Sequence, residues 1–417
     1  MSKTRNTLVA LLRDLPPRTF EVEFWNGETW PVDGDLPTEF TLTLAHPGSL
    51  RSMLLPLNDR TFGEAYVVGD IDLRGDLVAA MRVAYDIIET RRPLPERAAQ
   101  ALRLLALPSP ADRRPTELRA RLSGRQHSKP RDRQANEFHY SRSNALYQLL
   151  LDEAMAYTCG YFAGSDDSLD DAQRQKFDHV CRKLRLSPGD RLLDIGCGWG
   201  GLAIHAATNY NVTVRGLTIS SAQAELATER IAAAGLSDRC TIELRDFRDL
   251  TASEQYDKVA AIGLVEHLGP MLSRVYFAKA WELLKPGGVL LHHGMTTKAR
   301  EPMGSPFLES YVFPDAELMT LGETARLAED AGFEIVDVES LRRHYARTIR
   351  CWRERLDAKA PEAEELIGVR GVRVYRIYFA GLEYAYLRGR INLHQMLLVK
   401  SVKGQSSLPM TREDWYR

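Results

Sequence analysis

The chain contains 417 residues, more than an average single domain needs and enough to bury a large core, so two domains are expected. A hydrophobic content of 44%, a charged content of 27% and a formal net charge of −1 are typical of an ordinary globular protein and give no argument for a nucleic-acid partner. The apolar start is short and broken by charge, and no run approaches eighteen uncharged apolar residues, so we expect a cytoplasmic protein without a membrane-spanning helix. The cysteine spacing predicts neither a disulfide framework nor a zinc site; the cysteines are Cys159, Cys181, Cys197, Cys240 and Cys351.

Residues 1–90 predict a small α+β accessory domain that opens with a helix and continues in strands. Phe20, Val22 and Phe24 alternate with polar residues, and Asn26-Gly27 supplies two residues that tolerate the positive φ of a hairpin turn. Residues 62–88 indicate short turns that lead into a helix with an apolar stripe. None of these residues suggests chemistry.

Residues 91–134 predict a basic linker that is rich in proline. Twelve Lys or Arg side chains stand against four acids in residues 91–133. One interpretation is a solvated tether. The other is a polybasic surface that anionic lipid headgroups attract, by about 1 kcal/mol per charge near a membrane.

Residues 135–417 predict an α/β domain. Apolar runs at residues 191–196, 212–219, 240–246, 256–264 and 287–295 alternate with amphipathic stretches. This alternation favours a Rossmann-like, mostly parallel, doubly wound sheet with helices on both faces. Near the C-terminus, residues 372–400 predict a helix followed by a strand.

A glycine-rich turn follows the first of these strands. Gly196, Gly198 and Gly200 have the spacing GxGxG, where the chain turns sharply and its backbone can approach a ligand closely. Asp194 precedes the turn; an acid at this place can hold a cationic amino acid group, whereas it would repel the pyrophosphate of a dinucleotide. The motif therefore favours S-adenosylmethionine over NAD.

Polar residues follow the next two predicted strands. Thr218 and Gln223 offer neutral hydrogen bonds where many nucleotide-binding folds have an acid, and Asp246-Phe247 can frame an adenine by a hydrogen bond and by stacking. Each of these residues alone fits a core role equally well. Their positions at successive strand ends favour a ligand contact.

Five segments together carry a family resemblance. LLDIGCGWGG, GLTISSAQ and VEHLG, with HYSRSNALY and MAYTCGYF upstream, closely resemble the cyclopropane-fatty-acyl-phospholipid synthases and the mycolic-acid cyclopropane synthases, from about Asn136 to the C-terminus. The N-terminal 90 residues and the linker resemble the accessory domain of the phospholipid enzymes, which the mycolic-acid enzymes lack. The resemblance implies an unsaturated phospholipid substrate, peripheral contact with the inner face of the plasma membrane, and a homodimer. The N-terminal region also resembles that of fatty-acyl methyltransferases that install a methylene branch on oleoyl chains.

The resemblance also implies a set of site residues. The adenosylmethionine site would be lined by Tyr157, Thr158, Gly196, Gly198, Gly200, Thr218, Gln223 and the turn Asp246, Phe247 and Arg248. A bound bicarbonate would be held by Cys159, Glu266, His292, the backbone of Gly294, and Tyr345. Two positions depart from the family pattern: Ser141 stands where an acid is frequent, and Gly294 where a bulky aliphatic residue is frequent. We expect the pocket wall to lose apolar packing at Gly294.

These residue types suit alkylation of an alkene. An alkene is a poor nucleophile, so the reaction needs a cationic methyl donor that is held in line with the double bond in a dry pocket. In well-aligned systems, orientation and the exclusion of water lower the activation barrier by roughly 7 to 11 kcal/mol. An aromatic face stabilises the resulting carbocation by about 2 kcal/mol or more, and Tyr140 is the first candidate for that face. Bicarbonate then takes a proton from the new methyl group, while Glu266 orients it and one of the two acids keeps a proton.

Three other interpretations stay open. A hydride shift and loss of a different proton would give a methylene-branched chain. A methyltransferase of a small amine, phenol or carboxylate is disfavoured by the accessory domain and by the VEHLG segment. A lipid-binding protein that has lost activity is disfavoured by the intact glycines and the intact pocket set.

Overall fold

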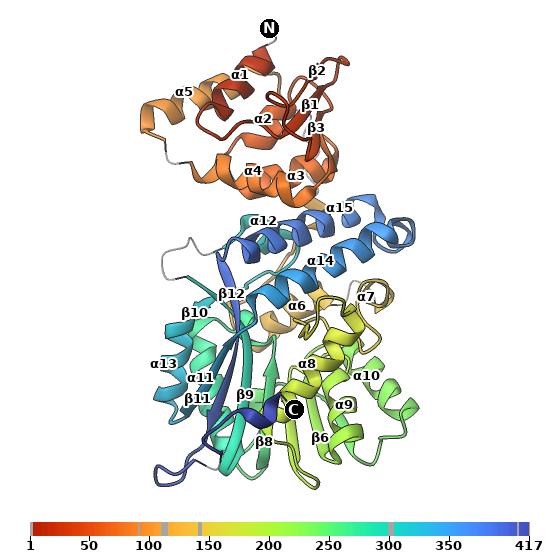
Figure 1. Cartoon of the computed structure of the whole chain (residues 1–417), viewed down its shortest axis with the longest axis vertical. Coiled ribbons are helices and arrows are strands. Elements are labelled where there is room, and N and C mark those ends of the chain that lie inside the picture. Colours follow the sequence, from red (N-terminus) through yellow and green to blue (C-terminus); the bar gives the residue numbers. More distant parts are fainter. Residues whose placement is uncertain are drawn as a thin grey trace. The chain divides into compact units, whose positions relative to one another are not determined.

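The computed structural model describes residues 3–90, 92–109, 116–140, 144–298, 304–406 and 408–416; Ser141 lies outside the described residues. The chain divides into two compact units, which interleave along the sequence (Figure 1). The first comprises residues 1–121, 304–314 and 356–384, and the second comprises residues 122–303, 315–355 and 385–417. The domain boundaries predicted from the sequence, 1–90, 91–134 and 135–417, are continuous segments and do not assign residues 304–314 and 356–384 to the first unit.

The first unit is built around a four-stranded sheet with the order β2-β1-β3-β4. The predicted opening helix and the hairpin are confirmed: β1 pairs antiparallel with β2, and Gly27, with φ 83°, donates its N–H to the Phe24 carbonyl at 2.9 Å. The elements are α1 (Lys3–Leu12), β1 (Phe20–Phe24), β2 (Thr29–Trp30), β3 (Phe40–Leu44), α2 (Ser49–Leu54), α3 (Asp59–Val68), β4 (Ile71–Gly75) and α4 (Leu77–Glu89).

The prediction of short turns after residue 62 was wrong, because this segment forms most of α3 and all of β4. Asn58 caps α3 by accepting the Thr61 N–H, and Gly69 ends it in a left-handed conformation. Gly63 lies inside the helix because of close packing: a Cβ there would lie 2.3 Å from Cδ2 of Phe307.

Segments distant in sequence complete the first unit. α5 (Leu94–Leu105) and η1 (Thr116–Leu118) fall in the segment predicted as a linker, and α12 (Pro306–Tyr311) and most of α15 (Ala360–Leu387) come from later in the chain. Glu64 joins two of these segments to α3, because its carboxylate accepts hydrogen bonds from the hydroxyl of Tyr311 in α12 at 2.7 Å and from Arg119, just after η1, at 2.5 Å.

We expect Glu64→Gln to destabilise the first unit by about 2 to 4 kcal/mol, because it removes one partner of a largely buried ion pair. Glu23→Gln is the matched control, since the pair of Glu23 with Arg74 is exposed and should contribute less than about 1 kcal/mol. Thermal unfolding followed by calorimetry measures both. Equal melting temperatures for the two variants would contradict the expectation.

The second unit contains a mostly parallel sheet with the order β11-β12-β9-β8-β5-β6-β7, with β10 paired to β9. Its strands are β5 (Arg191–Ile195), β6 (Thr213–Thr218), β7 (Cys240–Leu244), β8 (Tyr256–Ile262), β9 (Leu284–Thr297), β10 (Met319–Thr320), β11 (Glu334–Ser340) and β12 (Ile391–Val399). All five predicted strands are present, and β12 follows a helix as expected. Among the described strands of this sheet, β12 runs antiparallel to both of its neighbours, β11 and β9.

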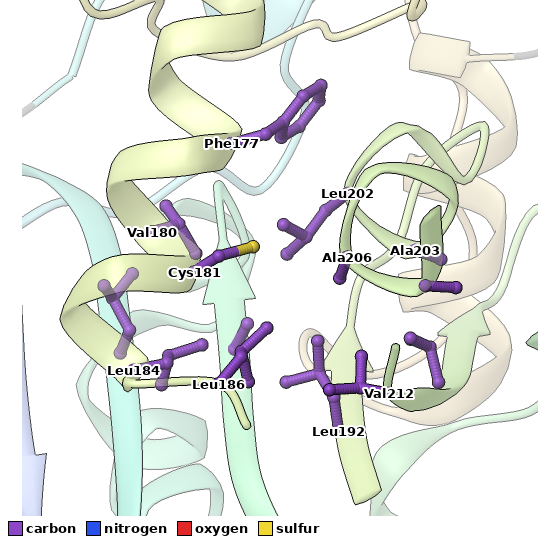
Figure 2. Close-up of a cluster of buried hydrophobic side chains, with 14 of the residues drawn as sticks. Phe177, Val180, Cys181, Leu184, Leu186, Leu192, Leu202, Ala203, Ala206 and Val212 are labelled. Carbon is purple, nitrogen blue, oxygen red and sulfur yellow. The ribbon is translucent and has the colours of Figure 1, made fainter. Parts of the chain in front are cut away.

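Helices cover both faces of this sheet. One core cluster joins α8 (Leu169–Leu184), α9 (Gly201–Tyr210) and α10 (Ser221–Ala233) to one face, and Figure 2 shows Val180, Cys181 and Leu184 of α8 facing the side chains of α9. A second cluster joins α11 (Gly269–Leu283) and α13 (Leu321–Asp330) to the other face. The predicted doubly wound fold is therefore confirmed. The other helices are α6 (Lys129–Tyr140), α7 (Asn144–Leu150), η2 (Phe247–Asp249), η3 (Val265–His267), α14 (Arg342–Ala358) and η4 (Glu413–Trp415).

In the part of the chain that the structure describes, no helix combines the length and the apolar character that crossing a bilayer requires.

Candidate functional site

The glycine-rich turn connects β5 to α9 at the carboxyl edge of the sheet. Gly196, Gly198 and Gly200 all have positive φ, at 79°, 54° and 80°, which favours glycine at each position. The N–H groups of Gly196 and Cys197 donate to the Leu217 carbonyl at 2.9 Å and hold the turn against β6. A Cβ on Gly198 would meet no atom of the described chain within 4 Å, so this part of the turn is open to a ligand.

Asp194 is the penultimate residue of β5, just before this turn. Its carboxyl group is buried, and burial raises its pKa to about 7, while the positive charge of Lys176 opposes the shift. A buried carboxyl group at an open glycine turn suits a cationic group of a ligand.

Two further predicted cofactor residues lie near the carboxyl end of β6: Thr218 is its last residue, and Gln223 lies in the first turn of α10. The Thr218 hydroxyl donates to Oε1 of Gln223 at 2.8 Å, and both side chains are buried. They therefore form one polar unit at the carboxyl end of β6.

The predicted turn after β7 is held by its own ion pair. The Asp246 carboxylate accepts from the backbone N–H of Arg248 at 2.9 Å and from its Nε at 2.8 Å. The Arg248 guanidinium also donates to Asp132 of α6 at 2.8 Å. The Phe247 ring is buried and meets Tyr276 edge-on, with 6.1 Å between centroids. Arg248 therefore joins this turn to α6, which ends at Tyr140.

Tyr140 and Tyr157 belong to one aromatic cluster. The Tyr140 ring is 6.3 Å from Tyr157 and 6.2 Å from Trp199, which lies inside the glycine-rich turn. The Tyr157 ring lies 4.8 Å from Trp352 of α14, which in turn lies 6.0 Å from Tyr345. The cluster therefore connects predicted cofactor residues with predicted catalytic ones.

Glu266, His292 and Gly294 lie together at the carboxyl end of β8 and on β9. Oε1 of Glu266 accepts the Met295 N–H at 2.8 Å, whereas no group among the described residues donates a hydrogen bond to its buried Oε2. Burial raises the pKa of Glu266 to about 7 and lowers that of His292 to about 4. Near neutral pH, His292 is therefore uncharged and Glu266 holds a proton in a large share of molecules.

Tyr140 is close to this acid. Burial raises the pKa of its hydroxyl, and the negative charge of Glu266 raises it further. The hydroxyl also lies 3.4 Å from Nε2 of His267. The aromatic ring thus stays uncharged beside Glu266.

The expectation of lost apolar packing at Gly294 was wrong. A Cβ on Gly294 would lie 2.4 Å from Cγ1 of Val265, so the valine side chain already fills this space. Val265 is buried and precedes Glu266 in η3.

Cys159 and Tyr345 lie by α14. The Cys159 thiol is fully buried, contacts the carbonyls of Gly160 at 3.1 Å and Leu341 at 3.9 Å, and has a pKa that burial raises. A thiol in this state is not a nucleophile. Tyr345 lies in the first turns of α14, with its ring 4.8 Å from that of Tyr386. The proposed contact of both residues with an anion stays a prediction.

Sequence reasoning missed Lys176, whose ammonium group donates to the Thr158 hydroxyl at 3.1 Å. It also missed Val265 and His267. Lys176 lies on the face of α8 that the apolar Phe177 and Val180 help to bury, and that helical spacing was the available signal.

Two family models match this chain, one in each part of the sequence. The family model described as "Mycolic acid cyclopropane synthetase" matches residues 127–396, and one described as "Domain of unknown function (DUF7884)" matches residues 7–90. A "Probable fatty acid methyltransferase" of Pseudomonas putida is 39% identical over 98% of this chain and 100% of its own length. The "Cyclopropane-fatty-acyl-phospholipid synthase" of Escherichia coli K12 is 37% identical over 64% of this chain and 67% of its own.

Solved structures agree with these relatives. The cyclopropane synthase MmaA2 from Mycobacterium tuberculosis is 32% identical, with a TM-score of 0.61, over 64% of this chain and 97% of its own. The mycolic acid cyclopropane synthase CmaA1, in a complex with SAH and CTAB, is 30% identical, with a TM-score of 0.61, over 64% of this chain and 98% of its own.

Proposed function

Because this chain belongs to the mycolic acid cyclopropane synthetase family of S-adenosylmethionine-dependent methyltransferases, which includes fatty acid methyltransferases and cyclopropane synthases, we propose that it acts on a membrane phospholipid. In this proposal it alkylates the cis double bond of an unsaturated acyl chain and closes a cyclopropane ring. The observation that carries the proposal is Glu266, a buried acid with one oxygen unpartnered among the described residues.

The second unit fits adenosylmethionine, which supplies an electrophilic methyl group on a sulfonium when it is bound. The open glycine turn at Gly198 admits a ligand to the backbone, and Asp194 offers a buried carboxyl group for the cationic amino acid end. Thr218 and Gln223 offer neutral hydrogen-bonding groups at the adjacent strand end.

The surroundings of Glu266 fit bicarbonate, which supplies a base that can exchange with solvent. The raised pKa of Glu266 allows its carboxyl group to donate a proton to an anion at Oε2. The His292 imidazole is neutral, and its Nδ1 lies 3.2 Å from the Tyr276 hydroxyl, so the ring is held in place. Gly294 is buried, and a Cβ there would lie 3.1 Å from Nε2 of His292, so its backbone lies close to this imidazole.

The aromatic cluster fits a reaction that develops positive charge on the acyl chain. Tyr140 presents a neutral ring beside Glu266, and such a face stabilises a desolvated cation by about 2 kcal/mol or more. Loss of one proton from the transferred methyl carbon then balances the charge as the third ring bond forms. The rings of Trp199 and Trp352 in the same cluster are buried, which favours a site with little bulk water.

The contact with a membrane is supported by α5. Leu94, Leu102 and Leu105 of this helix are exposed, and Arg97 and Arg103 are exposed beside them. An amphipathic basic helix of this kind binds at the headgroup boundary. We extend the proposal to peripheral attachment at the inner membrane face and, by the family resemblance, to a homodimer.

A methylene-branched product is the second candidate. It is favoured by the Pseudomonas putida relative, which covers both units of this chain and is named a fatty acid methyltransferase. Both products require the same methyl transfer, and in both the proton is lost from the transferred methyl carbon. For the methylene-branched product, a hydride first shifts to the cationic carbon, so that loss of this proton forms an exocyclic C=CH2 group instead of a ring.

The test incubates the purified protein with vesicles of mono-unsaturated phospholipid, adenosylmethionine and bicarbonate. Gas chromatography of the fatty acid methyl esters separates the two isomeric products. A cyclopropane ester whose yield falls when bicarbonate is removed supports the proposal. A methylene-branched ester would move the enzyme to the second candidate, and modification of a free fatty acid but not of the phospholipid would contradict the substrate.

A further inference from the structure

Lys176 is a lysine in the interior of the second unit. It lies in the middle of α8, only 1% of its surface is exposed, and its ammonium group stands 3.8 Å from the centroid of the Phe177 ring. Complete burial of a lysine is costly unless the charge is compensated by nearby groups. The groups around Lys176 therefore indicate which interactions compensate its buried positive charge.

The groups around Lys176 come from several elements. Its direct hydrogen bond goes to the hydroxyl of Thr158, at 3.1 Å. The titratable groups that interact with its charge are Asp152, Cys159, Cys181, Asp194, His205 and His293. Two of these are carboxylic acids, and the others are buried thiols and imidazoles.

The two acids differ in how they are satisfied. Asp152 accepts backbone N–H groups from Ala154 at 2.9 Å and from Ala156 at 3.0 Å, so the backbone already stabilises its charge. Burial raises the pKa of Asp194, and Lys176 is the one group that lowers it among the described residues that act on it. The ionised form of Asp194 thus depends on Lys176 more than that of Asp152 does.

Lys176 also contacts a second residue of the proposed cofactor site, Thr158. Thr158 adjoins Tyr157, and its Cγ2 would lie 3.0 Å from a Cβ on Gly263, at the end of β8. The same ammonium group therefore holds the loop before α8 through a hydrogen bond, and its positive charge lowers the pKa of the buried Asp194 in β5.

We propose that Lys176 is a positioning residue for the cofactor: its buried ammonium group keeps Asp194 ionised for the cationic amino acid end of adenosylmethionine and holds Thr158 against the same site. Lys176 acts through these two residues and does not touch the ligand. The inference rests on the cofactor site that the proposed function uses, and it is independent of the lipid substrate.

A pH dependence follows from the charges. Burial lowers the pKa of Lys176 to about 8 and raises that of Asp194 to about 7. Near pH 7 the lysine is charged and favours the carboxylate. Removing its charge raises the pKa of Asp194, so protons compete with the ligand at a higher pH. Above the pKa of Lys176 the wild-type protein loses the same charge, and the difference from a neutral variant becomes smaller.

The experiment titrates the full chain with S-adenosylhomocysteine, which carries the same amino acid end, from pH 6 to pH 9.5 by isothermal titration calorimetry. Lys176→Met should weaken binding about tenfold or more near pH 7 and less than threefold above pH 9, and Lys176→Arg should restore most of the affinity. The control ligand is 5′-methylthioadenosine, which lacks the amino acid end and should bind wild type and Lys176→Met within about twofold.

The outcomes separate this inference from the cofactor site itself. Asp194→Asn should weaken the binding of S-adenosylhomocysteine. In the Asp194→Asn background, the further change Lys176→Met should then leave the affinity unchanged. If Asp194→Asn weakens binding and Lys176→Met does not, the cofactor site stands and the role of Lys176 is overturned. If neither variant weakens binding, both the proposed cofactor site and the role of Lys176 are overturned. An equal loss for both ligands at every pH would reduce Lys176 to a structural residue and overturn the proposal.

Discussion

Replacement of Glu266 by Gln should reduce product formation by about 100-fold or more, while binding of S-adenosylhomocysteine changes less than threefold. The amide keeps Oε1, so the hydrogen bond from the Met295 N–H at 2.8 Å is retained. The change removes the titratable proton at Oε2, the buried oxygen to which no other described residue donates a hydrogen bond. Turnover with vesicles of mono-unsaturated phospholipid measures the loss.

Glu317→Gln is the matched control for this variant. The Glu317 backbone N–H donates to the Glu266 carbonyl at 3.0 Å, but its side chain is 41% exposed, so the rate should stay within about twofold of wild type. If Glu266→Gln keeps half of the wild-type rate, the proposed role of Glu266 in the reaction is contradicted. Loss of cofactor binding along with turnover would assign the effect to misfolding.

The same substitution should change how stability depends on pH. The folded-state pKa of Glu266, about 7, exceeds the ordinary value of 4.5, so the folded protein retains a proton that the unfolded chain releases. This contribution to stability is complete below pH 4.5 and is lost as the pH rises to 7. Its size is about 1.4 kcal/mol for each unit of pKa difference.

Glu266→Gln should therefore lose less stability than the wild type between pH 4.5 and pH 7. Urea unfolding of both proteins, at several pH values and without added bicarbonate, measures the difference. Parallel curves for the two proteins would show that the carboxyl group titrates alike in the folded and unfolded chain. Asp194 has the same sign of shift, but it is present in both proteins and cancels in the comparison.

The features predicted correctly from the sequence are those that depend on local patterns. The apolar run at residues 191–196, followed by glycines of fixed spacing, specifies a strand, a sharp turn and a helix within one short segment. The hairpin at Asn26-Gly27 is similarly local. The open part of the turn at Gly198 follows from residue type alone, because glycine is the residue that tolerates the conformation without side-chain bulk.

The missed features depend on contacts between distant residues. The segment after residue 62 was predicted to form turns, yet Gly63 lies inside a helix, where the Phe307 ring packs against it. Lys176 has the sequence appearance of a solvated helix residue, and its burial and its hydrogen bond to Thr158 are visible only in the structure. The recruitment of residues 304–314 and 356–384 into the first unit also follows from side chains far apart in sequence, such as the contact of Tyr311 with Glu64.

Gly294→Ala should reduce turnover at least tenfold and lower stability by about 1 to 3 kcal/mol, because the added methyl group overpacks a buried site. Its carbon would lie 2.4 Å from Cγ1 of Val265 and 3.1 Å from Nε2 of His292. Gly294 lies in β9, paired with His394, and its φ is not positive, so the loss comes from the side chain and not from the backbone. Turnover and urea unfolding measure the two effects.

Val265→Ala added to Gly294→Ala should recover much of both losses, because it removes the methyl group with which the new carbon collides. Val265→Ala alone leaves space beside His292 and should cost about 1 to 2 kcal/mol, so the double variant should be more stable than the sum of the two single changes by about 1 kcal/mol or more. Gly322→Ala is the control, since a Cβ in this α13 position meets no described atom within 4 Å. Additive losses in the double variant would mean that Val265 does not fill the space at Gly294. Such a coupling would identify these two positions as one packing unit next to Glu266, which follows Val265 in η3.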